Sequence, residues 1–242
     1  MTVLKSSGRN IDFLLFLLFL TFFSSCSARI DGTFREGGAA DITIQTSLEP
    51  STLTLIRSLQ NFMGDDNDTP VLDAQSISQS MAMLPGVRAV SLRNTDPSTL
   101  DGSISISNVE DFLAVEGAES RFISYTQAPG ASSIVIILNS NTAPLLISRL
   151  SGEIVEHLSA FFAPVVTGDS STRQEYLDLV SSIYGRPLAE EISAARILAR
   201  IEFPRPIIGV QGGTFTARRA EFNIPLLDLL VLEHPLRYED RW

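Results

Sequence analysis

Hydrophobic and polar side chains alternate along residues 41–49, where isoleucine, threonine or leucine fills every second position. A repeat of two residues places one set of side chains on each face of a strand, so this segment is predicted to be a half-buried strand. The segment 30–35 before it and the intervening pair Gly37-Gly38 complete the pattern of a β-hairpin over residues 29–49. The globular part of the chain is therefore predicted to open with antiparallel β-structure.

Helical spacing replaces this alternation at residues 51–63, where apolar side chains recur every three or four positions. The longest predicted helix has the same spacing and covers residues 143–162. Capping residues or prolines mark further helix starts at Asp73, Asn108, Thr172 with Glu175, Pro187 and Pro225. In the helix that starts after Thr172, the predicted inward face consists of Tyr176, Val180, Ile183 and Tyr184.

Later strands are predicted from short alternating or apolar runs that are bounded by turn residues. They cover residues 87–93, 103–107, 121–127, 132–139, 196–203 and 214–224, with a final edge strand over 236–242. Asp96-Pro97 and Asp101-Gly102 are predicted to turn the chain between the first two of these strands. The run Ile134–Leu138 is apolar at every position, which predicts a central strand covered on both faces.

This order of strands and helices predicts an α+β fold with a mostly antiparallel sheet backed by helices on one side. The helical stretch 143–195 is compatible with an insertion into a β domain whose two parts, 29–140 and 196–242, pair with each other. Residues 30–242 are expected to form a single domain, which is long enough to bury a core without disulfides or metals.

The charge balance argues against nucleic acid as a partner. The 242 residues include 18 lysines and arginines but 28 aspartates and glutamates, which gives a formal net charge of −10. Binding to a phosphate backbone requires clustered positive charge. We therefore expect no nucleic-acid partner.

The first 25 residues have the composition of an export signal. Lys5 and Arg9 provide a positive start, and the apolar run Phe13–Phe23 follows. Its 11 residues fit the hydrophobic region of a signal peptide and fall short of the ~20 that span a bilayer. Residues 1–25 are therefore predicted to be a signal peptide.

The end of this signal, Phe23-Ser24-Ser25-Cys26, resembles the lipobox of bacterial lipoproteins. In that family the cysteine thiol receives a diacylglycerol and signal peptidase II cleaves just before it. Phe23 stands where leucine is usual, and in this respect the box is similar to the looser boxes of spirochaetal lipoproteins. Cys26 is the only cysteine of the chain, so it cannot form an internal disulfide. The alternative is an ordinary signal peptide cut near Ser25 or Ala28.

The resemblance implies a lipid-anchored protein of the bacterial cell envelope, with a lipidated Cys26 and a short tether over residues 26–29. It implies a membrane location facing the periplasm or the cell surface, and the outer membrane if the sorting rule for Ser27 applies. The opening hairpin and the closing segment from Phe203-Pro204 to Trp242 also resemble LppM-type lipoprotein domains of other bacteria.

Candidate metal and catalytic residues are few. Asp65, Asp66 and Asp68 could supply oxygen ligands to calcium, but Pro70 and Ser76 occupy positions where an EF-hand loop needs glycine and glutamate. A solvated loop explains this acidic cluster better, so no metal site is expected.

The other candidate groups also have simpler structural explanations. His157 lies on an apolar helical stripe and His234 precedes a proline in a loop. Glu190 and Glu191 are helix neighbours about 100° apart, so they cannot face each other as a catalytic pair. No phosphate-binding loop or nucleophile elbow is present, and no catalytic residue or cofactor is expected.

Three functional hypotheses remain open. The first is a non-enzymatic envelope lipoprotein that binds a partner protein or has a structural role. The second is a ligand or lipid carrier with an apolar cavity lined by Ile134–Leu138, Phe161 and Phe162. The third is a hydrolase whose carboxylates meet only in the folded chain, which strongly raised carboxyl pKa values inside one cleft would reveal.

Overall fold

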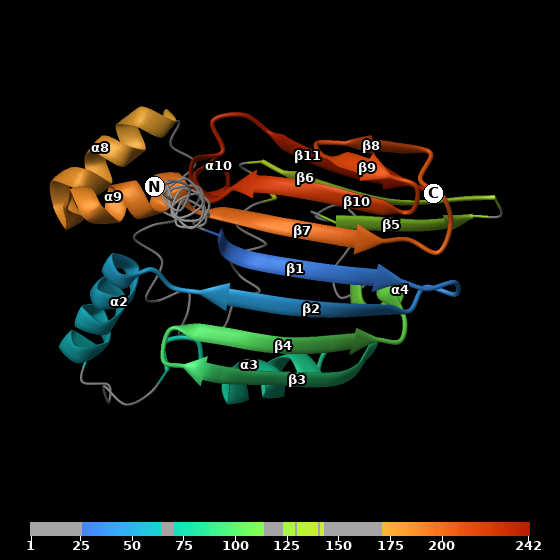
Figure 1. Ribbon diagram of the computed structural model, residues 1–242, viewed down its shortest axis with the longest axis horizontal. Coiled ribbons are helices and arrows are strands. Elements are labelled where there is room, and N and C mark those ends of the chain that lie inside the picture. Colours follow the sequence, from blue (N-terminus) through green and yellow to red (C-terminus); the bar gives the residue numbers. More distant parts are fainter. Residues whose placement is uncertain (1–25, 64–69, 114–122, 129, 140, 143–170) are drawn as a thin grey trace, which may run out of the picture.

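The computed structural model describes residues 26–63, 70–113, 123–128, 130–139, 141–142 and 171–242. In this part of the chain, eleven strands form two sheets and six helices pack around them (Figure 1). The predicted α+β class with mostly antiparallel pairing is confirmed. The acidic cluster Asp65–Asp68, the predicted helix 143–162 and His157 lie outside the described residues.

The larger sheet has seven strands in the order β3-β4-β2-β1-β7-β10-β9. Its strands are β1 (Cys26–Phe34), β2 (Ala40–Ser47), β3 (Val87–Asp96), β4 (Thr99–Ile106), β7 (Arg196–Glu202), β9 (Thr214–Thr216) and β10 (Arg219–Pro225). All its neighbours are antiparallel except β1 and β7, which run parallel. This parallel pair joins the two ends of the chain, as the predicted pairing of 29–140 with 196–242 requires.

The smaller sheet has four antiparallel strands in the order β5-β6-β11-β8. They are β5 (Ile123–Ala128), β6 (Ala131–Leu138), β8 (Gly209–Gln211) and β11 (Leu236–Arg241). The predicted central position of β6 is confirmed, because it lies between β5 and β11. The predicted edge position of the last strand is wrong, since the three-residue strand β8, too short to show a pattern, pairs with the outer side of β11.

The helices are α2 (Pro50–Met63), α3 (Ala74–Ala82), α4 (Val109–Leu113), α8 (Arg173–Tyr184), α9 (Arg186–Ala194) and α10 (Leu226–Val231). Their starts confirm the predicted caps. The Asp73 carboxylate accepts hydrogen bonds from the backbone N–H groups of Gln75 and Ser76. Thr172 and Glu175 form the complete capping box. α2, α8 and α9 gather at the end of the larger sheet where β1 begins, and α3 packs along β3 (Figure 1).

Gly102 is a strand residue rather than the turn residue that the sequence predicted. It lies inside β4 with a φ of 155°, and a Cβ at this position would collide with the carbonyl of Ser91 on the neighbouring strand. The chain turns at the other predicted signal, Asp96-Pro97, where Asp96 accepts a hydrogen bond from the Ser98 backbone N–H. A glycine that permits close approach of two strands carries the same sequence signal as a turn glycine.

The main core lies between the two sheets. Its centre is aromatic: Phe34 at the end of β1 and Phe203 just after β7 pack on Trp242, which follows β11. Further along, Phe222 meets Tyr238 edge to face, with ring centroids 5.7 Å apart. Burying an aromatic side chain of this size contributes on the order of 1.5–3 kcal/mol, so these contacts are a main force that holds the sheets together.

A second, helical core closes one end of the molecule. It consists of buried apolar side chains from α8, α9 and α10, namely Tyr176, Val180, Leu188, Ala189, Ile192, Leu227, Leu230 and Val231. Tyr176 and Val180 were predicted to face inward, and they do. Ile183 and Tyr184 were also predicted inward, but they are 60% and 36% exposed, because α9 and α10 cover the face that carries Tyr176 and Val180.

Candidate functional site

Cys26, the predicted lipidation residue, is the first residue of β1. Its Cα is the ladder partner of Arg196 at the start of β7, and a register shift separates it from the next pair, formed by Ala28. Residues 26–29, expected to form a tether, thus belong to the β1 strand. Among the described residues, no helix has the length and hydropathy to cross a bilayer.

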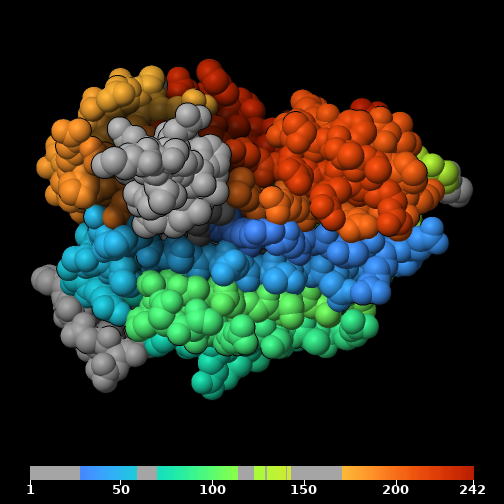
Figure 2. Space-filling view, in the orientation of Figure 1, coloured from blue at the N-terminus to red at the C-terminus, as the bar shows by residue number. Residues whose placement is uncertain are grey.

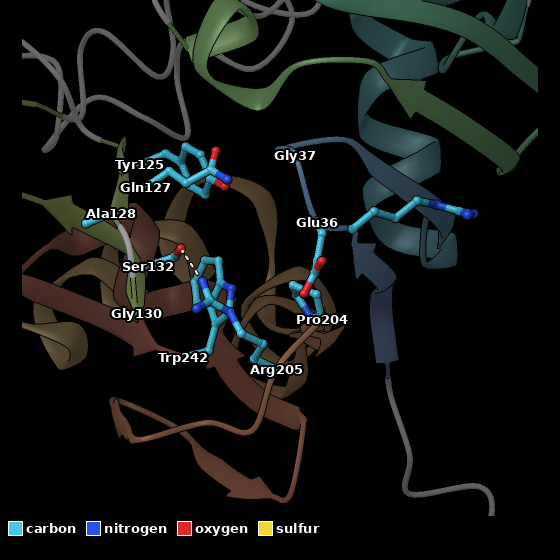
Figure 3. Close-up of a pocket in the computed structure, with 11 residues that line it drawn as sticks. Glu36, Gly37, Tyr125, Gln127, Ala128, Gly130, Ser132, Pro204, Arg205 and Trp242 are labelled. Atoms are coloured by element: carbon cyan, nitrogen blue, oxygen red, sulfur yellow. Dashed lines mark hydrogen bonds between the residues drawn. The ribbon is translucent and has the colours of Figure 1, made fainter.

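A pocket of about 480 Å³ lies at the opposite end of β1. It has a size typical of sites for small molecules. Four segments line it: the turn after β1, the β5–β6 hairpin, the connection after β7 and the end of β11 (Figure 3). The lining residues are Arg35, Glu36, Gly37, Tyr125, Gln127, Ala128, Gly130, Ser132, Pro204, Arg205 and Trp242.

The aromatic wall of this pocket is rigid because it belongs to the main core. Trp242 is 2% exposed and stacks on Phe203, and its ring centroid is 6.1 Å from that of Tyr125. The Trp242 backbone N–H donates to the Ser132 carbonyl over 3.0 Å, and the Ser132 backbone N–H donates back to the Trp242 carbonyl over 2.7 Å. These two bonds hold the Trp242 backbone beside β6, and the stack on Phe203 positions its indole.

Arg205 supplies positive charge to the pocket. Its Nη2 donates a hydrogen bond to the Ser132 hydroxyl over 3.1 Å, and within the described part of the chain it forms no ion pair (Figure 3). Arg35, by contrast, is neutralised by Asp41, to which its Nε donates over 2.9 Å. The hydrogen bond from Ser105 and the Arg35 guanidinium lower the pKa of Asp41, so this carboxylate stays ionised. Within the described residues, Arg205 thus differs from Arg35 in having no carboxylate that neutralises it.

The remaining polar groups add donors and acceptors around this charge. Burial, with a smaller effect of Glu110, raises the pKa of Tyr125, so its hydroxyl stays protonated and can donate a hydrogen bond. Gln127 provides an amide, and Glu36 lies on the exposed rim beside Pro204. A pocket that holds a guanidinium and two aromatic side chains suits a ligand with an anionic group on a flat or apolar body.

Sequence reasoning missed this pocket. Trp242 was interpreted as the closing residue of an edge strand, and Arg205 was not considered. The available signal was Pro204-Arg205-Pro206, an arginine held between two prolines directly after an apolar strand. Proline fixes φ, so such a loop presents its arginine with little freedom.

The predicted candidates have structural roles where they are described. His234 lies in the bend before β11. Glu190 pairs with Arg186 at the surface over 2.7 Å. The Glu191 carboxylate accepts hydrogen bonds from the backbone N–H groups of Ser51 and Thr52 and from the Thr52 hydroxyl, and so caps α2. The described residues contain no group of three or more histidine, cysteine, aspartate or glutamate side chains that could hold a metal.

Asp240 is a buried carboxyl on the inward face of β11, between Tyr238 and Trp242. It is 2% exposed, and its Oδ1 has no hydrogen-bond partner among the residues that the structure describes. Burial raises its pKa to about 7. Asp240 does not line the pocket beside Arg205. Hydrolysis by carboxylates normally uses two such groups, whereas this one is packed among apolar side chains of the core.

The comparisons with known proteins leave the family open. No family model matches the chain. No curated protein matches it either. The chain is similar in structure to the folded domain of LppM from Mycobacterium tuberculosis, solved by NMR, with 11% sequence identity and a TM-score of 0.37. The match covers 88% of this chain and 86% of that one. A likeness at this identity and TM-score carries no argument about function.

Proposed function

We propose that this chain is a membrane-anchored lipoprotein of the bacterial cell envelope that acts by binding rather than by catalysis. The support for the anchor is the apolar leader Phe13–Phe23 followed by the single cysteine of the chain, Cys26. The position of Cys26 at the start of β1 is consistent with this role. A lipid there would hold the domain directly at the bilayer surface.

The pocket lies at the far end of the strand that starts at this anchor. β1 has nine residues, and the steps of ~3.3 Å from its first Cα to its last give a length of about 26 Å. A domain held at Cys26 would therefore present the pocket away from the membrane, toward the periplasm or the cell surface. This geometry suits a protein that meets a dissolved ligand while it stays on the membrane.

The observation that carries the binding role is Arg205. Its guanidinium has a hydroxyl but no carboxylate as a partner among the described residues, and it lines the same pocket as Tyr125 and Trp242. We infer a small anionic ligand with a flat or apolar body. The expected envelope protein partner stays a prediction, as does the absence of catalysis.

Trp242 offers a direct test, because it is the only tryptophan of the chain and it lines the pocket. Phenyl phosphate is added to the full-length protein in detergent while the tryptophan fluorescence is recorded. We expect a saturable change with the wild type and at least about tenfold weaker binding for Arg205→Gln, since a hydrogen bond to a charged group contributes ~1.5–3 kcal/mol.

Arg237→Gln is the matched control, because Arg237 is a surface arginine that pairs with Glu239 outside the pocket. This variant should bind phenyl phosphate as the wild type does. Phenol, which lacks the anion, should bind weakly to all three proteins. Equal affinity of Arg205→Gln and wild type would show that the guanidinium does not recognise the anion, and the proposed ligand class would be wrong.

A further inference from the structure

The second half of α8 exposes apolar residues to solvent. Leu179 is 53% exposed, Ile183 60% and Tyr184 36%. Leu179 and Ile183 are four positions apart and share one side of the helix, whereas Tyr184 lies about 100° further round. These three side chains are called here the α8 apolar face. The segment between Asp178 and Arg186 contains no charged residue. An uncharged helical surface of this kind is suited to contact with an apolar partner.

The α8 apolar face continues into a groove of about 490 Å³. Ile183 and Tyr184 belong to both, and α2 forms the opposite wall of the groove. Among the described residues its lining consists of uncharged side chains, namely Pro50, Ser51, Thr54, Leu55, Ser58, Ile183, Tyr184, Pro187 and Leu188. The groove and the α8 apolar face thus adjoin each other across α2, α8 and the start of α9, where Arg186 and Glu190 form an exposed ion pair beside them.

This surface lies at the same end of the molecule as Cys26. The ladder partner of Cys26 is Arg196, which lies only two residues after the last residue of α9. The neighbouring strand β2 ends at Ser47, and α2 starts three residues later. Figure 2 shows α2 beside α8 and α9 at this end, and Figure 1 shows β1 starting there.

We propose that the α8 apolar face and its groove dock on the lipid bilayer that holds the acyl chains of Cys26. The proposal rests on the proposed lipid anchor. Because Cys26 already belongs to β1, no spacer separates the acyl chains from the sheet, and the adjoining surface must lie close to the bilayer. Burial of leucine and isoleucine at the interface then adds to the acyl anchor.

Charge favours the same orientation. The net charge of −10 opposes contact between most of the protein surface and anionic headgroups. The lining of the groove and the three side chains of the α8 apolar face carry no charge, so this part of the surface adds little to the repulsion. Docking through it would also fix the long axis of β1 relative to the membrane and keep the pocket beside Arg205 on the far side.

The test measures the depth of two fluorescent labels in the acylated full-length protein. Acylation blocks the Cys26 thiol, so the cysteine introduced by Ile183→Cys is the one that takes the label. Phe215→Cys is the matched control, because Phe215 is 47% exposed on β9, which pairs with the end of β10 nearest the last residue of β7. Vesicles of phosphatidylethanolamine and phosphatidylglycerol carry nitroxide-labelled lipid as the quencher.

The label at position 183 should lose most of its emission in these vesicles, whereas the label at position 215 should keep it. Equal emission at both positions in protein that floats with the vesicles would overturn the docking surface and leave the anchor intact. A label at 183 that is shielded from a water-soluble quencher before vesicles are added would also overturn it, since another part of the chain would then cover α8. Protein that fails to float would count against the anchor itself.

Discussion

Phe203 and Trp242 stack with their ring centroids 4.2 Å apart and an interplanar angle of 28°, and each is at most 2% exposed. Phe203 directly follows β7 of the larger sheet, and Trp242 directly follows β11 of the smaller sheet. The stack therefore links the two sheets at the ends of these two strands. The same indole lines the pocket beside Arg205. The core therefore sets the shape of the pocket.

The first prediction concerns this stack. Phe203→Ala should lower the free energy of unfolding by about 3–5 kcal/mol, because it removes a buried ring and leaves a cavity. Urea denaturation followed by the fluorescence of Trp242 measures the change. Phe215→Ala removes an exposed ring from β9 and should change the stability by less than about 0.5 kcal/mol. Equal losses in the two variants would mean that the stack does not stabilise the core.

The second prediction concerns Asp240 and pH. Its pKa is about 7 in the folded chain, against ~3.9 for an unfolded aspartate. Between these values the unfolded chain has released the proton that the folded chain still holds, so this group makes stability fall as pH rises. Below pH ~4 both states are protonated, and above pH ~7 the loss is complete, on the order of 4 kcal/mol.

Asp240→Asn removes this titration. The unfolding temperatures of the two proteins should therefore diverge from about pH 4 to pH 7, because the wild type loses stability over this range and the variant does not. Above that range the difference between the two temperatures should stay constant. Asp178→Asn, at an exposed position on α8, controls for the loss of one negative charge. A stability difference between Asp240→Asn and wild type that is independent of pH would contradict the raised pKa.

The third prediction compares two adjacent glutamates of α9. Glu191→Ala should lower the free energy of unfolding by about 1–2 kcal/mol. It removes the carboxylate that accepts hydrogen bonds from the Ser51 and Thr52 N–H groups at the start of α2. Glu190→Ala removes only an exposed ion pair with Arg186 and should change stability by less than about 0.5 kcal/mol. Chemical denaturation of both variants tests this order, and a reversed order would show that Glu191 does not hold α2.

Local patterns predicted much of the fold. The hairpin of β1 and β2, the Asp73 cap and the capping box of Thr172 with Glu175 follow from residues close in sequence, and all three were predicted correctly. The failures lie where distant contacts decide the outcome. β8 has three residues and exists as a strand because β11 pairs with it.

The pocket was beyond sequence reasoning for the same physical reason. Its four lining segments are spread along the sequence from residue 35 to residue 242. No local pattern of residues predicts that they come together. Pro204-Arg205-Pro206 marks a stiff loop with a charge but does not say which aromatic side chains will face it. The exposed position of Ile183 was equally hidden, since helical spacing indicates an apolar side without showing how much of it a neighbour covers.

The proposed membrane location and the docking of α8 both depend on the lipid at Cys26. Mass spectrometry of the protein extracted from membranes measures it directly. We expect a mature chain that starts at Cys26 and carries diacylglycerol on its sulfur, and we expect Cys26→Ala to move the folded domain into the soluble fraction of the envelope. An unacylated chain that begins at any other residue, or that keeps its apolar leader, would contradict the account.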